Sequence, residues 1–185
     1  MMNYTNLINE VRSAAKSLGL PIGIYDKDNS FNLLEEDRGK APYLPSTTEL
    51  DNISANDLSI KMTEFSAWYS YLNSRHTEYY TSLLALKEQK DLLVSQTISS
   101  SNNEKPMQKK AKLKSSEEYQ NLQYNITYLE MLCNMIKTEM DNAENIYKSL
   151  SRIITARLGE NTINNRDNNH NFMRPKKSPT IIGGK

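Results

Sequence analysis

Apolar residues recur at helical spacing along most of this chain and define two long helices. Over residues 55–98, the positions from Leu58 to Leu93 follow alternating steps of four and three residues, which keeps one helix face turned toward a partner. Over residues 115–158, the positions from Tyr119 to Arg157 follow the same alternation. The two stretches have equal length, so each predicts a helix of roughly 66 Å at about 1.5 Å per residue. Equal helices joined by a short polar break predict an all-α fold, a long antiparallel helical hairpin of coiled-coil type.

Four segments follow from this pattern and its flanks. Residues 1–18 are predicted to contain a short amphipathic helix that ends at a glycine. Residues 19–53 carry three prolines and an acidic cluster, which predicts an extended, flexible acidic arm whose apolar residues can dock elsewhere. Residues 54–159 form the hairpin, with Gly159 ending the second helix. Residues 160–185 are rich in Asn and in basic residues, and we expect a disordered basic tail.

Each long helix carries more apolar residues than one hairpin contact uses. Trp68 and Tyr71 flank the first seam, and Tyr128 and Ile146 flank the second. An apolar stripe wider than two positions in seven serves more than one neighbour. We therefore expect the hairpin to pack against the N-terminal segment or against another copy, and the protein is predicted to be a homo-oligomer.

Composition and charge fit an elongated helical protein with polar ends. Hydrophobic residues make up 37% of the chain and mean hydropathy is -0.70, both low for one compact core. The net charge is only +1. However, residues 1–60 hold 5 Lys/Arg against 9 Asp/Glu, and residues 148–185 hold 8 against 2. Such a basic end suggests an anionic partner, which is nucleic acid, a membrane surface or an acidic protein.

The single cysteine and the absence of long apolar runs bear on the compartment. Cys133 cannot form an intrachain disulfide, which favours a reducing setting. The N-terminus lacks the apolar stretch of a signal peptide, and no apolar run approaches the ~20 residues of a membrane span. We expect a cytoplasmic protein without membrane contact, located in the host cytoplasm if the chain is viral.

Signals of catalysis are weak. Cys133 and His76 could face each other across the hairpin, but a packed thiol and a hydrogen-bonded imidazole are the simpler interpretation. The chain has no phosphate-loop, dinucleotide-binding, zinc-protease or serine-hydrolase motif. We expect no catalytic residue, no metal site and no cofactor.

Two features are candidates for binding nucleic acid. Five lysines gather in the break between the helices, with little negative charge nearby: Lys105, Lys109, Lys110, Lys112 and Lys114. Their contact with phosphates would give an affinity that falls steeply with salt, and a solvated turn is the alternative. An aromatic belt near Arg75 could stack on single-stranded bases, although packing in a helical interface is the favoured interpretation. The belt consists of Trp68, Tyr69, Tyr71, Tyr79 and Tyr80.

Residues 58–89 of the first long helix have at their centre the run Trp68-Tyr69-Ser70-Tyr71-Leu72-Asn73-Ser74-Arg75-His76. This stretch resembles the first long helix of phage recombination mediator proteins of the UvsY type. The second helix is similar in layout, with Ala143-Glu144 and Ile153-Ile154-Thr155-Ala156-Arg157. The resemblance covers residues 55–158. It implies a non-enzymatic helical oligomer that binds single-stranded DNA, contacts the single-strand-binding protein and loads a recombinase. It also implies that the lysines of the hairpin tip and Arg75 are the DNA contacts.

Two functions therefore remain open at this point. The protein is predicted to be a DNA-binding accessory factor of phage recombination or replication. Alternatively, it is a structural or scaffolding coiled-coil protein of a virion or another assembly, whose arms tie neighbouring copies together.

Overall fold

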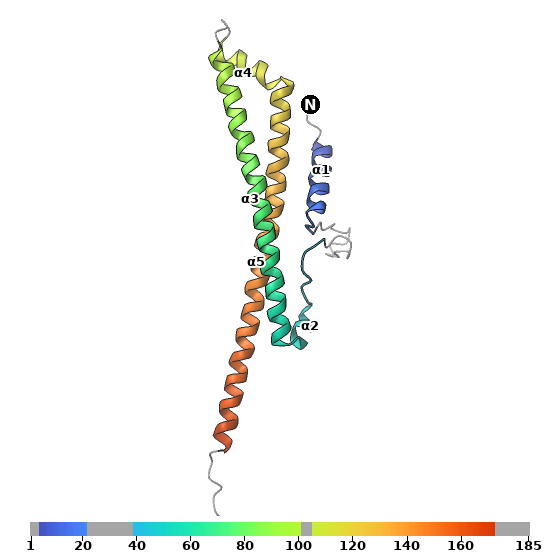
Figure 1. The fold of residues 1–185 in the computed structure, drawn as a ribbon, viewed down its shortest axis with the longest axis vertical. Helices are drawn as coiled ribbons and strands as arrows, with labels where there is room; N and C mark the ends of the chain where they lie inside the picture. Colours follow the sequence, from blue (N-terminus) through green and yellow to red (C-terminus); the bar gives the residue numbers. More distant parts are fainter. Residues whose placement is uncertain (1–3, 22–38, 101–104, 173–185) are drawn as a thin grey trace, which may run out of the picture.

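The computed structural model describes residues 4–21, 39–100 and 105–172, and every regular element within these ranges is a helix. Figure 1 shows the two long helices side by side along the molecule, with a short helix joining them at one end. The predicted all-α hairpin is confirmed. The helices are α1 (Tyr4–Ser17), α2 (Thr47–Asn52), α3 (Ala55–Ser99), α4 (Pro106–Lys114) and α5 (Glu117–Phe172).

Cross-helix contacts establish that α3 and α5 run antiparallel. The Trp68 indole nitrogen Nε1 donates to Glu139 Oε1 at 3.2 Å. Nearer the tip, Lys87 pairs with Glu130 at 2.7 Å. Residue numbers rise along α3 while those of their partners fall along α5, as a hairpin requires.

The seam of α5 matches its prediction more closely than the seam of α3. Most predicted positions of α5 are buried: Leu122, Ile126, Leu129, Cys133, Ile136, Met140, Ala143 and Leu150. Along α3, only four of the eleven predicted positions are buried, and the others stay partly exposed, among them Met62, Tyr69 and His76. Trp68 lies outside the predicted seam of α3, yet it is only 5% exposed. The buried face of α3 is therefore rotated toward Trp68 and away from Tyr69.

The N-terminal helix α1 contributes to the same hydrophobic core as Trp68. The apolar residues Leu7, Val11 and Ala15 are at most 1% exposed and belong to the same core as α3 and α5. A marginally short helix is thereby held in place by tertiary contact. The expectation that the N-terminal segment packs on the hairpin is confirmed.

Gly19 ends α1 in the predicted way. The Gly19 amide donates to Lys16 and the Leu20 amide donates to Ala15, which is the Schellman pattern. Gly19 has φ +78°. The returning chain passes against it, since the Lys40 amide donates to the Gly19 carbonyl at 2.8 Å. A Cβ on Gly39 would lie 2.2 Å from that carbonyl oxygen, so this approach requires glycine.

The predicted acidic arm contains the short helix α2 near its end. Ser46 and Glu49 form a capping box at its N-terminus, and Tyr43 donates to Glu49 Oε2 at 2.7 Å. These hydrogen bonds, that of Tyr43 foremost, lower the pKa of Glu49. At the C-terminus of α2, the Arg157 guanidinium of α5 donates to the carbonyls of Ile53 and Leu50. This part of the arm is therefore docked on the hairpin and is not an extended linker.

Two predicted boundaries were wrong. The break at residues 99–114 contains α4, because Pro106 stands at the start of a helix, where its missing N–H costs nothing. The second long helix does not end at Gly159 and continues to Phe172. One interior glycine costs only about 0.5–1 kcal/mol, which is too little to stop a helix whose flanks continue it. The two long helices thus differ in length, with 45 and 56 residues. The acidic cluster at 35–37 and the tail beyond residue 172 lie outside the described residues.

Candidate nucleic-acid interface at the hairpin tip

The five predicted lysines all lie in or next to α4, the helix that joins α3 to α5 (Figure 1). Leu113 and Lys109 are the buried residues of α4, spaced four apart on the face that rests on the long helices. The nine residues of α4 include four lysines and no acidic residue. The sequence pattern thus builds a short helix that is anchored by one buried face and carries exposed lysines on both flanks of that face.

Lys109 is the exception among the five lysines. It is only 7% exposed, and its Nζ donates to the carbonyls of Ile98, at 3.4 Å, and of Ser100. These carbonyls lie at the C-terminal end of α3, where a cation compensates the helix dipole. The ammonium of Lys109 is therefore engaged inside the fold, and we leave Lys109 out of the exposed basic surface.

The other four lysines present their side chains to solvent: Lys105, Lys110, Lys112 and Lys114. They span α4, which is roughly 14 Å long at about 1.5 Å per residue. That length corresponds to roughly four phosphates of one strand at about 3.4 Å each. We call this surface the lysine face, and it is the strongest site of positive charge among the predicted residues.

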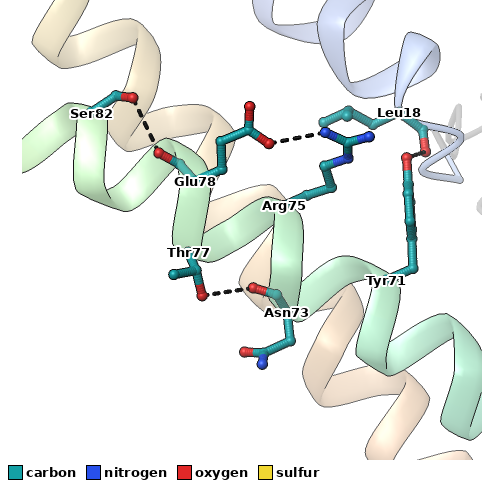
Figure 2. A network of polar contacts seen from close by, with 7 residues as sticks. All are labelled: Leu18, Tyr71, Asn73, Arg75, Thr77, Glu78 and Ser82. Carbon is teal, nitrogen blue, oxygen red and sulfur yellow. Dashed lines mark hydrogen bonds and ion pairs between the residues drawn. The ribbon is translucent and has the colours of Figure 1, made fainter.

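Arg75 is not part of this surface. It lies 24 residues before the end of α3, which is roughly 36 Å along the helix at about 1.5 Å per residue. Figure 2 shows its guanidinium pointing to Glu78, at 2.9 Å, and it also lies 5.5 Å over the ring of Tyr71. The hydrogen bond with Glu78 raises the pKa of Arg75. Arg75 therefore lies apart from the tip lysines and is paired with Glu78, and its role as a DNA contact stays a prediction.

The aromatic belt is mostly covered. Trp68 stacks on Tyr71 with ring centroids 5.4 Å apart, and the Tyr71 hydroxyl donates to the carbonyl of Leu18 at 3.2 Å (Figure 2). On α5, Tyr124 donates to Glu10 of α1 at 2.7 Å. Tyr71 of the belt and Tyr124 of α5 therefore hold the segment that contains α1 against the hairpin, which supports the packing interpretation for Trp68 and Tyr71. Tyr80 differs, because it is 47% exposed and stacks on His76.

Two charged positions have roles that the sequence did not indicate. Glu139 accepts from Trp68 and from Asn142 at the core, and burial raises its pKa. Arg157 of α5 donates to carbonyls at the C-terminal end of α2. Both roles depend on residues about 70 to 107 positions away, which no local pattern reveals.

The remaining chemistry of the described residues is limited. Burial raises the pKa of the Cys133 thiol, which disfavours the reactive thiolate. Among the described side chains, no three His, Cys, Asp or Glu residues gather as metal ligands would. None of the described helices is long and apolar enough to cross a membrane.

No protein-family model, curated protein or solved structure matches this chain.

Proposed function

We propose that the protein is a non-enzymatic helical accessory factor that binds single-stranded DNA through the lysine face of α4. The observation that carries the proposal is the arrangement of Lys105, Lys110, Lys112 and Lys114 around a helix without acidic residues. The buried Lys109 and Leu113 fix that helix across the tip, so the lysine face is held on a rigid support. The lysine face offers several cations and no side chain suited to hydrogen-bond base edges. We therefore expect it to bind the phosphate backbone without preference for sequence.

In cellular terms, the proposal extends to recombination. The resemblance to UvsY-type mediators suggests that the DNA-bound protein assists the loading of a recombinase together with the single-strand-binding protein. This extension rests on the helix pattern alone, whereas the DNA-binding step rests on the lysine face.

The test is fluorescence anisotropy with a labelled single-stranded oligonucleotide. Four phosphate contacts give a slope near −2.8 in log affinity against log salt, so affinity falls about 50-fold between ~50 and ~200 mM salt. In a Lys110→Ala/Lys114→Ala variant the slope halves, and the same change in salt costs only about 7-fold. A matched control, Arg12→Ala/Lys61→Ala, removes the same charge far from the tip and leaves the slope unchanged. No binding at ~50 mM salt would reject the proposal.

A structural or scaffolding role is the second candidate, and exposed apolar residues on α3 favour it. Tyr80, Leu84 and Leu92 are 47%, 49% and 56% exposed. An assembly role predicts that the protein associates without DNA and that the Lys110→Ala/Lys114→Ala variant keeps its function in the assembly.

A further inference from the structure

One side of the hairpin is covered by α1 and by residues 39–46, and no described element lies along the opposite side (Figure 1). On that opposite side, α3 exposes Tyr69, His76, Tyr80 and Leu84, which fall within one quadrant of the helix at about 100° per residue. We call the surface formed by these residues and the adjoining flank of α5 the open face. It lies away from Tyr71, which contacts Leu18 just after the end of α1.

The open face contains both a projection and a recess. Tyr80 projects with 47% of its surface exposed and rests on His76. Further from the tip, a groove of about 290 Å³ lies between α3 and α5, and its apolar lining comes from Phe65, Tyr69 and Tyr147. An aromatic ring of one molecule could therefore enter the groove of another.

The flank of α5 carries a regular charge pattern. Glu130, Lys137, Asp141 and Lys148 lie within about 40° of one another around the helix. Within one copy, Glu130 pairs with Lys87, Lys137 with Asp141 and Lys148 with Glu144, so an interface would make these exposed pairs exchange partners. Their signs alternate, and they are placed symmetrically about position 139, since 130 and 148 are each nine residues away and 137 and 141 are each two away. A second copy that runs antiparallel about this point would set Glu130 against Lys148 and Lys137 against Asp141, so that every facing pair has opposite charge.

The same axis brings the projection to the recess. The contacts of Trp68 with Glu139 and of Lys90 with Gln123 place position 139 opposite about residue 72 of α3. A two-fold axis at that level exchanges Tyr69 with His76 and sets Tyr80 opposite Phe65 in the groove of the second copy. The charges of α5 and the shape of α3 therefore indicate the same register independently.

We propose that the open face is the interface of an antiparallel two-fold dimer of this chain, in which Tyr80 of each copy fills the groove of the other. Positions 130–148 extend over roughly 27 Å at about 1.5 Å per residue, and two neighbouring helices are about 20 Å wide. The face therefore offers about 540 Å² per copy, so the two copies together just exceed the ~1,000 Å² of a specific interface. Such a two-fold interface is self-complementary, as this surface is. The lysine faces of the two copies then lie at opposite ends of the dimer. The proposal does not depend on DNA binding.

The first experiment measures mass by sedimentation equilibrium of the full chain, without DNA, from ~5 to ~200 µM. The wild type is expected to reach twice the monomer mass. Tyr80→Glu places a charge in the groove of the second copy and is expected to weaken association by at least about tenfold. Leu92→Glu is the matched control on another side of α3, and it leaves association unchanged. Circular dichroism confirms that both variants keep their helices.

The second experiment tests the register with charge reversal. Lys148→Glu or Glu130→Lys alone is expected to weaken the dimer roughly tenfold, because each change acts at two symmetric places. The double variant restores the opposite-charge pairs across the interface and recovers most of the affinity. A wild type that stays monomeric at ~200 µM would overturn the proposal. So would equal effects of Tyr80→Glu and Leu92→Glu, or a double reversal that is weaker than either single one.

Discussion

Substitution of Lys109 tests whether its buried ammonium stabilises the end of α3, and the exposed neighbour Lys110 provides the control. Lys109→Met removes the ammonium while it keeps an unbranched apolar stem of similar length. Lys110→Met makes the same chemical change at an exposed position of the same helix. Any difference between the two variants therefore reports what the buried ammonium does at the end of α3.

The magnitude follows from the two carbonyls that Lys109 contacts. The bond to Ile98, at 3.4 Å, is long and contributes little, so one charge-assisted hydrogen bond, to Ser100, dominates. Such a bond contributes about 1.5–3 kcal/mol, and water that reaches the exposed Ser100 replaces part of it. A net loss of about 1–2 kcal/mol is expected for Lys109→Met. For Lys110→Met the expected change is within about 0.5 kcal/mol, as for most surface substitutions.

Hydrogen exchange of the last turns of α3 and of α4 measures this effect where it arises. A loss of about 1.4 kcal/mol speeds exchange about tenfold if the tip opens locally. The oligonucleotide affinity should respond in the opposite way, falling for Lys110→Met and holding for Lys109→Met when the tip is folded. Equal exchange in the two variants would refute the assigned role. If Lys109→Met binds DNA more weakly while hydrogen exchange at the tip is unchanged, Lys109 contacts the DNA directly.

The remaining predictions concern the core and its docked segments. Glu139→Gln keeps an acceptor for Trp68, so it should stabilise the protein at pH 7 by about 1.4 kcal/mol per unit of raised pKa. Burial favours the protonated acid, so the wild type loses stability as pH rises through the pKa of Glu139 in the folded protein. The stability advantage of Glu139→Gln should therefore vanish as pH falls below 4.5. Chemical denaturation of both proteins across this pH range measures the difference. Arg157→Met should release α2, seen as faster exchange at residues 47–52 with little change in α5. Val11→Asp buries an unpaired carboxylate and should detach α1 at a cost of about 3 kcal/mol or more, measured by proteolysis at residues 4–18.

Much of the fold could be predicted from the sequence, because helical periodicity is a local property. The seam of α5 from Leu122 to Leu150 is buried nearly as predicted, and α3 begins and ends within one residue of its expected bounds. Gly19 ends α1 as its missing Cβ allows. The wrong boundaries were those at which a single glycine or proline was taken as a sign that no helix could continue or form. Gly159 lies inside α5, and Pro106 starts α4.

The candidate site was predicted only as a set of charges. The pattern of lysines located the basic tip, but it could not separate Lys109, which faces inward, from Lys110, which faces outward. That distinction depends on how α4 lies across the ends of α3 and α5. Arg75 differs, because Glu78 and Tyr71 lie three and four residues from it on the same helix, so its pairing with them could have been predicted from helical spacing.

The two long helices, their antiparallel pairing and the positions of charge follow from local patterns, because spacing along a helix fixes which residues share a face. The sequence also indicated that the hairpin had more apolar surface than one pairing could bury. Only the tertiary structure decided how that surface is used. The rotation of α3 places Trp68 in the core to which α1 contributes and leaves Tyr69 and Tyr80 on the open face, and this core is built by three helices that are distant in sequence.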